Sequence, residues 1–451
     1  MLTATRLRRV PPLVGLCLLA FGVAAVPATA RAAEPGAGVP TFAGDVAAIF
    51  QAKCQACHRP GMMAPMSLLT YQDARPWARA IRQRVMLREM PPWHLDKTVG
   101  ITRYKDDRSL TDEQIDTIVR WVDGGAPLGN PADLPPPLEF NDDEWTIGVP
   151  DLIVTSPEAV MYPEGSDWWP SYVVDPGLTE TRYARAVETR PSQEGREFVH
   201  HAIASLIDPE ARDTPARLGQ GEPVIDPLEG AYLSEYAPGK YGDIFPENTG
   251  RALKAGVKIR FSMHYFATGR EMRDRTSVGF VLYPKDVEPE SYITDLFIHE
   301  NDTIDIPPGE MTRTDTYYSL PAAARIISYQ PHLHLRGKAQ CMEAIYRDGR
   351  VEMLSCVDRF DFNWHVAYHY EDDVMPLLPA GTMLHLISIH DNTVTNRRNP
   401  DPTVWVGWGQ RSIDDMAAAH IGVQYLADED YERMVAERSA RPQGRLSAGG
   451  E

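Results

Sequence analysis

The sequence predicts a multidomain protein in which a small all-α domain is followed by two all-β domains in tandem, each a jelly roll or β-sandwich. The chain has 451 residues, which at roughly 150 residues per domain allows about three domains. Residues 41–128 show helical periodicity and helix caps. From residue 150 to about residue 430, short apolar segments alternate with turn signals, a pattern typical of stacked β-sheets.

Acidic residues outnumber basic ones along the chain. Aspartate and glutamate total 63, against 45 lysines and arginines, for a formal net charge of -18. This balance argues against a phosphate-binding surface, and hence against nucleic acid as a partner. The 5 cysteines and 13 histidines are few enough for each metal-capable side chain to be considered individually.

The first residues are typical of a secretory signal peptide. Arginines precede an apolar segment from about Leu13 to Val26, which is followed by small residues. The apolar segment is shorter than the ~20 residues that a membrane span needs. We therefore predict that residues 1–33, including Cys17, are removed on export, and that the protein is periplasmic or secreted without stable membrane insertion. An uncleaved membrane anchor is the alternative.

The elements of each domain follow from local patterns. Residues 34–130 are predicted to form the helical domain, with a third helix that begins at the cap Thr111 after helices over 43–53 and 71–88. A proline-rich connector over 131–149 marks a domain boundary. The β-domains are expected over 150–290 and 291–430, before a flexible tail (431–451) that starts with a helical turn. The predicted strands are Asp151–Thr155, Phe198–Ile207, Lys258–Tyr265, Ser277–Tyr283, Ala324–His334, Cys341–Tyr346 and Met383–Ile389.

Cys54, Cys57 and His58 form a Cys-x-x-Cys-His motif at the end of the first predicted helix. In an exported chain this motif predicts one covalent haem c, with the cysteines in thioether linkage and His58 as an axial iron ligand. A disulfide beside a chance histidine is the alternative. This part of the chain resembles class I cytochrome c over residues 41–128. Met90 is the predicted sixth ligand, and the competing residues are Met62, Met63, Met66 and His94.

The histidines after the connector occur in an informative order. His200 and His201 are adjacent, so two ligands here would need a bulge or a strand end, because neighbours on a regular strand face opposite ways. His264 follows in another predicted strand. His332 and His334 are two residues apart, so both imidazoles would project from one face of a strand and chelate one ion. Any one of these is more often a structural histidine, but together they predict metal sites.

These residues resemble the copper type II ascorbate-dependent monooxygenases, the family of peptidylglycine α-hydroxylating monooxygenase and dopamine β-monooxygenase. The resemblance covers residues 150–425, and its motifs are the His200-His201 pair, His264-Tyr265, the His332-x-His334 motif with Gly337-Lys338, and Asp-Asp-Met ending at Met416. It implies two copper ions, the first held by His200, His201 and His264 and the second, which binds dioxygen, by His332, His334 and Met416. A soft thioether favours cuprous copper, and a blue copper site is not expected because no cysteine accompanies these ligands.

Two departures from the family concern the substrate. Gln330 stands where the peptide-hydroxylating members have an arginine, and His420 stands where they have a tyrosine. Both changes argue against a peptidylglycine substrate. His420 either contacts substrate or belongs to the core. His365 and His369 lie in strand-like sequence and are predicted to be structural or solvent-facing.

Cys341 and Cys356 are the remaining cysteines. They are equidistant from Asp348-Gly349, a two-residue hairpin signal that would place them opposite each other. In an oxidising compartment this arrangement predicts a cross-strand disulfide. Two unpaired buried thiols are the alternative.

The predicted function is that of an exported haem- and copper-dependent monooxygenase, which hydroxylates a C–H bond of a small organic substrate with dioxygen. His332, His334 and Met416 are the expected catalytic residues. The cytochrome domain is expected to deliver electrons from an external donor, either a redox protein or an ascorbate-like reductant. The alternatives are a non-hydroxylating electron-transfer protein and a copper-binding protein for storage or sensing.

Overall fold

The structure is a computed structural model that describes residues 38–440 apart from 61, 63, 65, 141–144, 166–167, 208–230, 238–239, 241, 300–303 and 410. The predicted signal peptide with Cys17, the candidate ligand Met63, and the last residues of the predicted tail lie outside the described residues. Within the described part, the protein is mostly β-sheet with few helices. No helix there is long and apolar enough to span a membrane.

The helical segment follows the predicted elements closely. It contains η1 (Phe42–Val46), α1 (Ala47–Lys53), α2 (Tyr71–Ala74), η2 (Arg75–Trp77), α3 (Ala78–Met86) and α4 (Asp112–Asp123). The predicted helix start at Thr111 is confirmed, because the Thr111 hydroxyl accepts from the Gln114 N–H while the Gln114 side chain accepts from the Thr111 N–H. The apolar faces of these helices share a core around fully buried Trp121.

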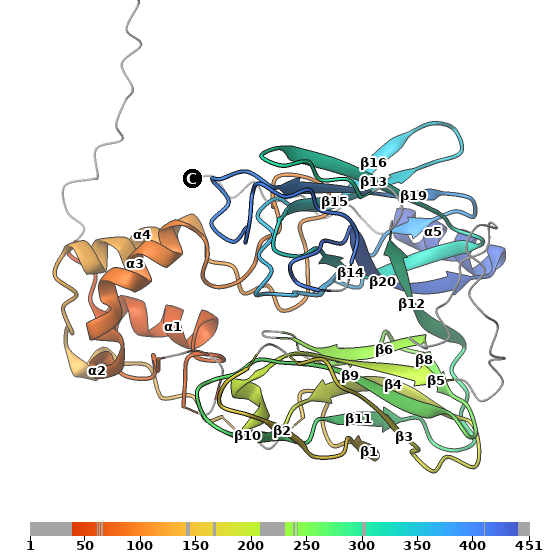
Figure 1. The fold of residues 1–451 in the computed structure, drawn as a ribbon, viewed down its shortest axis with the longest axis horizontal. Coiled ribbons are helices and arrows are strands. Elements are labelled where there is room, and N and C mark those ends of the chain that lie inside the picture. Colours follow the sequence, from red (N-terminus) through yellow and green to blue (C-terminus); the bar gives the residue numbers. More distant parts are fainter. Residues whose placement is uncertain are drawn as a thin grey trace, which may run out of the picture. The chain divides into compact units, whose positions relative to one another are not determined.

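The first sandwich consists of two sheets that enclose a common apolar core (Figure 1). One sheet runs in the order β1-β11-β4-β8 and the other in the order β3-β9-β5-β6. Alternate residues of a strand face this core, as the burial pattern of β9 shows. The bounds are β1 (Leu152–Thr155), β3 (Ser171–Val174), β4 (Arg182–Arg190), β5 (Val199–Ile207), β6 (Ala231–Tyr236), β8 (Thr249–Leu253), β9 (Lys258–Tyr265) and β11 (Ser277–Leu282), with short strands β2 (Ala159–Met161), β7 (Asp243–Ile244) and β10 (Met272–Asp274) at the periphery.

The second sandwich is built in the same way. Figure 1 shows β13, β15, β16 and β19 in one layer and β12, β14 and β20 in another. A large core fills the space between these layers. The bounds are β12 (Ser291–His299), β13 (Met311–Ser319), β14 (Ala323–His332), β15 (Gly337–Ile345), β16 (Val351–Val357), β17 (Tyr368–His369), β18 (Leu377–Leu378), β19 (Met383–Asp391) and β20 (Ala418–Leu426).

A continuous sheet joins the two sandwiches. β8 pairs in parallel with β12, with Ser291 opposite Thr249 and Tyr292 opposite Gly250. The ladder β1-β11-β4-β8 of the first sandwich therefore continues into β12-β20-β14 of the second. The two sandwiches are therefore connected by strand pairing as well as by the chain.

The segment between α3 and α4 packs against the second sandwich, which the sequence does not predict. Trp93, Leu95 and Tyr104 belong to the core of that sandwich. The Asp96 N–H donates to the Cys356 carbonyl at 2.8 Å, and two further backbone contacts, from Ile101 to Leu354 and from Lys105 to His369, measure 2.9 and 2.8 Å. Apolar burial and main-chain hydrogen bonding together attach the helical segment to the second sandwich.

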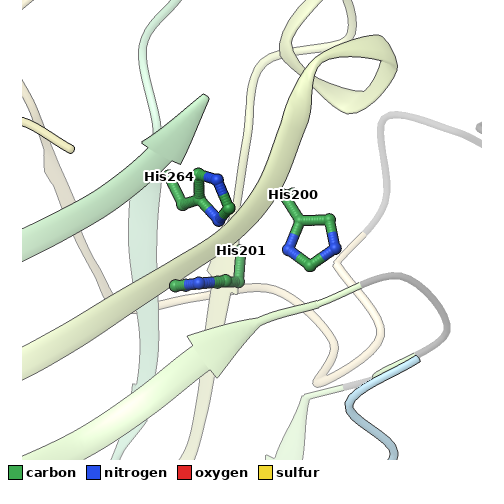
Figure 2. Close-up of side chains that lie close together, drawn as sticks. All are labelled: His200, His201 and His264. Atoms are coloured by element: carbon green, nitrogen blue, oxygen red, sulfur yellow. The ribbon is translucent and has the colours of Figure 1, made fainter. Parts of the chain in front are cut away.

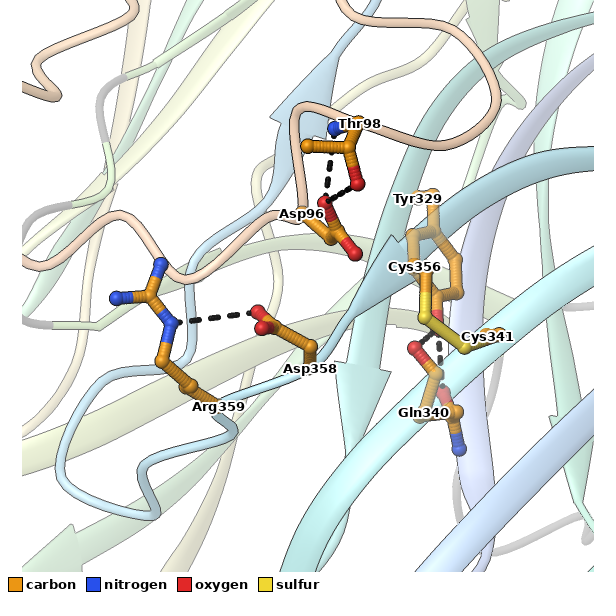
Figure 3. Close-up of a disulfide and its surroundings, with 8 residues drawn as sticks. All are labelled: Asp96, Thr98, Tyr329, Gln340, Cys341, Cys356, Asp358 and Arg359. Atoms are coloured by element: carbon orange, nitrogen blue, oxygen red, sulfur yellow. Dashed lines mark hydrogen bonds and ion pairs between the residues drawn. A yellow bond between two sulfur atoms is a disulfide. The ribbon is translucent and has the colours of Figure 1, made fainter. Parts of the chain in front are cut away.

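The predicted disulfide between Cys341 and Cys356 is present (Figure 3). The two cysteines are register partners on β15 and β16. The predicted two-residue turn is wrong, because the Tyr346 N–H donates to the Arg350 carbonyl and leaves three residues, with Gly349 at φ 84°, to close the hairpin. A register shift between Met342 and Glu343 compensates for the extra turn residue and brings the cysteines opposite each other.

The end of the chain also differs from the prediction. The expected helical turn from about Tyr431 is a helix, α5, that spans Asp428–Ala440. Acidic residues occupy its first turn and Arg438 lies in its last, which complements the helix dipole. The connector after α4 is mostly exposed, as predicted, and contains the short helix η3 (Pro131–Asp133).

Candidate metal centre

The first histidine cluster consists of His200, His201 and His264. Each offers one ligand atom, and these three atoms lie within 4.8 Å of one another (Figure 2). His201 on β5 is the register partner of His264 on β9. The register shifts between Val199 and His201, so His200 is the extra residue of a β-bulge. The bulge that the sequence required for two adjacent ligands is therefore present.

Burial lowers the pKa of one member of this cluster, His201. His264 is only 3% exposed, and the indole of Trp169 stacks on its ring at 4.7 Å between centroids. Burial, followed by the neighbouring His264 and His200, holds the pKa of His201 well below its usual range. The Nδ1 atom of His201 is buried and has no hydrogen-bond partner among the described residues. A neutral imidazole with a free lone pair is the form that binds copper or zinc, so the donor set fits such a metal.

His332 and His334 lie at the end of β14. The strand ends at His332, which pairs with Ala418, so His334 lies just beyond the regular ladder. Only His332 lies on the strand, so the expectation that both imidazoles project from one strand face is not met in that form. The two rings nevertheless lie close together, with centroids 5.5 Å apart. Burial lowers the pKa of both histidines. His334 Nδ1 lies 3.3 Å from the carbonyl oxygen of Asp414, which leaves Nε2 for a ligand.

Asp415 connects the backbone of Met416 to that of His334, which lies just beyond β14. Its Oδ1 accepts hydrogen bonds of 2.9 Å from the N–H groups of both His334 and Met416. The Met416 carbonyl in turn lies 3.0 Å from Nε2 of His390. Met416 precedes Ala418, the partner of His332, by two residues. The structure thus links the backbones of His334 and Met416 through Asp415, and the predicted ligands His332, His334 and Met416 are called the second cluster below.

His365 lies between the two clusters, which the sequence analysis missed. Its ring centroid is 5.1 Å from that of His332 and 6.0 Å from those of both His200 and His201. The side chain is 3% exposed, so the expectation of a solvent-facing position is wrong. The strand-like sequence around His365 predicted a structural or solvent-facing residue, whereas the segment after β16 forms turns before β17 begins. His369 has a structural role, as expected, with Nε2 3.2 Å from Asp243.

Gln330 and His420 lie directly opposite each other on β14 and β20. The Gln330 amide donates to Glu235, and His420 Nδ1 lies 3.1 Å from Asp295. Both side chains line a small, partly open cavity of about 40 Å³, which has room for water but not for an organic substrate. His420 was predicted either to contact substrate or to belong to the core, and the structure favours a place in the core.

The Cys-x-x-Cys-His motif follows α1. Cys54 and Cys57 are free thiols rather than a disulfide, and burial raises the pKa of Cys54 to about 12. His58 Nδ1 lies 3.1 Å from the Met66 carbonyl oxygen, so Nδ1 is the protonated nitrogen and Nε2 is left for a metal. Two unlinked thiols and an oriented imidazole fit a covalently attached haem.

The structure argues against one of the candidates for the sixth haem ligand and leaves others open. His94 is buried, and its N–H donates to the Tyr368 hydroxyl at 3.2 Å, so the second sandwich surrounds it. This position argues against His94 as an iron ligand. The Met62 sulfur accepts a hydrogen bond from Arg196 Nη1 at 3.4 Å. Met90 follows α3, with its N–H directed at the Arg84 carbonyl, and its role as the sixth ligand stays a prediction.

Comparisons with known proteins do not assign this chain to a family. No family model matches it, and no curated protein matches it. A solved structure described as "The Triple Jelly Roll Fold and Turret Assembly in an Archaeal Virus" aligns with a TM-score of 0.14 and 9% identity, covering 60% of this chain and 59% of that one. This chain therefore spans less than two thirds of the viral protein's length, and a TM-score this low carries no argument about fold or function.

Proposed function

We propose that this protein is an exported haem- and copper-dependent monooxygenase that hydroxylates a C–H bond of a small organic substrate. In such a reaction one oxygen atom of dioxygen enters the C–H bond and the other leaves as water, which consumes two electrons and two protons from a donor. The observation that carries the proposal is that the predicted ligands His200, His201 and His264 offer ligand atoms within 4.8 Å of one another. The predicted ligand His332 lies nearby, because the ring of His365 is 6.0 Å from that of His200 and 5.1 Å from that of His332. The disulfide between Cys341 and Cys356 supports export.

The two clusters would hold one copper ion each. His200, His201 and His264 form the first site, and His332, His334 and Met416 form the second. Bound copper would supply one-electron redox chemistry at both sites and dioxygen activation at the site with the soft sulfur ligand. Asp415 positions the second set, because its carboxylate holds the backbone of both His334 and Met416. The Phe362 ring stacks on His200 at 5.3 Å and limits access of water to the first set.

A cytochrome c domain would supply the electrons. Cys54, Cys57 and His58 would hold haem c, which can pass single electrons from a donor protein or an ascorbate-like reductant. The contact between Arg196 and Met62 supports this route, because Met62 follows the haem motif and Arg196 lies four residues before His200. The helical segment is therefore in contact with the turn that immediately precedes the strand carrying His200 and His201.

The substrate is expected to lack the carboxylate that a peptide would present. The position that resembles the family's carboxylate-binding arginine holds Gln330, whose amide is engaged by Glu235. A carboxyl group offers no cationic anchor in either protonation state, and burial raises the pKa of Glu235 towards the neutral form. We therefore propose a neutral or cationic small molecule as the substrate class.

A cofactor census tests the proposal. We expect metal analysis to find two coppers and a pyridine haemochrome assay to find one haem per chain. Replacing His200 and His201 with Phe should remove one copper, and replacing His332 and His334 with Phe should remove the other. His385→Phe is the control, because this buried histidine is held by Asp315 and Glu343 rather than by a cluster. Copper content that is unaffected by both double substitutions would refute the proposal.

The same census separates the alternatives. A chain that binds both coppers and haem but consumes no dioxygen when reduced would be an electron-transfer or copper-binding protein. The thioether of Met416 favours the monooxygenase, since storage or one-electron transfer does not require a dioxygen-binding cuprous site.

A further inference from the structure

Trp169 lies directly opposite His264, a member of the first cluster. It precedes β3, which pairs antiparallel with β9, and the bridge between Trp168 and Tyr265 continues the same register. The next residue along the chain, Trp169, therefore faces His264, which is in turn the register partner of His201. An indole and two imidazoles of the first cluster thus form one row across three neighbouring chain segments.

Backbone hydrogen bonds hold this pair in place on both sides. Trp168 and Tyr265 exchange hydrogen bonds of 3.0 and 2.9 Å, and a further bond of 3.0 Å links the two segments beyond Trp169. Trp169 and His264 lie between these bonds, at the kind of antiparallel position where opposite side chains approach most closely. Their rings are accordingly stacked, with an angle of 22° between the planes and 4.7 Å between the centroids.

The indole of Trp169 lies outside the apolar core of the first sandwich. Trp169 is 49% exposed, whereas His264 is 3% exposed. The indole therefore covers a buried imidazole while much of its own surface meets solvent. A half-exposed tryptophan gains only part of the free energy that full burial of its side chain would supply. Its removal should therefore have little effect on the stability of the metal-free fold.

Stacking on an indole favours an imidazole that has bound a metal. A metal ion withdraws electron density from its imidazole ligand, and the negative face of the indole attracts the ring that becomes more positive. The contact also restricts rotation of the imidazole, as the outer-shell partners of metal ligands do. We propose that Trp169 is a positioning residue for the first cluster, which holds the His264 ring in its metal-binding orientation and stabilises the bound ion. This inference rests on the proposed copper site at the first cluster.

Copper affinity tests this role. The full chain in which Phe replaces both histidines of the second cluster serves as the background, and cupric ion is titrated against a competing chelator. Adding Trp169→Leu should weaken copper binding by about 10-fold, as expected for the loss of one aromatic pair at an outer-shell position. Trp169→Phe keeps a ring opposite His264 and should restore most of the affinity.

Trp168→Leu is the matched control. Trp168 is 40% exposed, but its ring contacts Tyr265, at 5.7 Å between centroids, rather than a histidine of the first cluster. Its replacement should leave the copper affinity at the background value.

Tryptophan fluorescence provides a readout that a purely structural role would not change. The chain has 9 tryptophans, and cupric ion bound to His264 should quench the indole that stacks on this ligand. Trp169→Phe should therefore lose part of the copper-induced quenching while it retains most of the affinity. The melting temperature of metal-free Trp169→Leu should equal that of the background.

The outcomes separate this role from the copper site itself. If the background binds no copper, the proposed first site and this inference both fail. If the background binds copper and Trp169→Leu does not weaken binding, or if Trp168→Leu weakens it equally, the site stands and the positioning role is refuted. A lower metal-free melting temperature in Trp169→Leu would assign the indole a structural role instead. Weaker binding with Leu, recovery with Phe and an unchanged metal-free melting temperature would support the inference.

Discussion

The Asp415 carboxylate accepts a hydrogen bond of 2.9 Å from the backbone N–H of His334. The same oxygen accepts from the N–H of Met416, and the other oxygen accepts from the N–H of Arg336 at 3.1 Å. Although burial alone would raise the pKa of Asp415, the nearby His390 lowers it, so the carboxylate is ionised. One fully buried negative charge thus fixes the backbone that carries an imidazole and a thioether of the second cluster.

Replacing Asp415 with Asn should therefore damage the second cluster. Asn keeps the size of the side chain but removes the charge opposite His390, and breaking a buried charge pair typically costs about 3–5 kcal/mol of stability. We expect a lower free energy of unfolding and loss of copper from the second site, measured by denaturant titration and metal analysis. Asp414→Asn is the matched control, because the Asp414 side chain forms an exposed pair with Arg411 while its carbonyl contacts His334. Equal effects of the two substitutions would contradict this role.

The hydrogen bond from Arg196 to Met62 should influence electron delivery. Replacing Arg196 with Leu removes the donor to the Met62 sulfur. We expect slower oxidation of the haem by the coppers in stopped-flow absorbance, with unchanged haem and copper content. Arg270→Gln is the control, because it removes the adjacent exposed pair with Glu197 without touching Met62. A normal rate in the Arg196 variant would show that this contact does not lie on the route.

The disulfide should stabilise the second sandwich and the segment attached to it. Cys341 and Cys356 are 15 residues apart, and closing a loop of that length is worth about 3 kcal/mol. Replacing both with Ser should lower the free energy of unfolding by about that amount and loosen the contact of Asp96 with Cys356. Urea titration measures the first effect and hydrogen exchange at the Asp96 amide measures the second. If stability falls but exchange at the Asp96 amide is unchanged, the disulfide does not support the attachment of the helical segment.

Acid should destabilise the segment around His94. Burial lowers the pKa of His94 to about 4, below the value of about 6.5 in an unfolded chain. The unfolded state therefore binds more protons between these values, so the contribution of neutral His94 is complete above about pH 6.5 and is lost as the pH falls towards 4. Compared with His94→Phe, the wild type should lose on the order of 2 kcal/mol more stability between pH 7 and pH 5. Parallel pH profiles for the two proteins would contradict the assignment.

Local patterns predicted much of the fold and of the two clusters. The adjacency of His200 and His201 required a bulge, and the register shift before His201 provides it. The symmetry of the cysteines about Asp348-Gly349 predicted the correct pairing, although a three-residue turn and a compensating bulge produce it. These features could be predicted because each depends on the alternation of side chains along one strand or hairpin.

Features that depend on contacts between distant segments could not be predicted. Trp93 and Tyr104 are read locally as parts of a loop in the helical segment, yet they pack in the core of the second sandwich. His365 lies in strand-like sequence that gave no sign of its neighbours, and only the fold brings it near His332 and His201. The sequence contains no local signal for such contacts, because the partners are hundreds of residues apart or belong to another sheet.

Reoxidation of the haem in the Met416→Ile variant tests the central claim most directly. The fully reduced protein is mixed with dioxygen, and haem absorbance is followed together with the copper content of each site. If the second cluster is the site of dioxygen reduction, wild-type haem should oxidise in step with oxygen consumption, whereas the variant should retain copper at the first cluster while haem oxidation and oxygen consumption both stop. Oxygen consumption at the wild-type rate in Met416→Ile, or haem that stays reduced while wild-type protein consumes oxygen, would contradict the account.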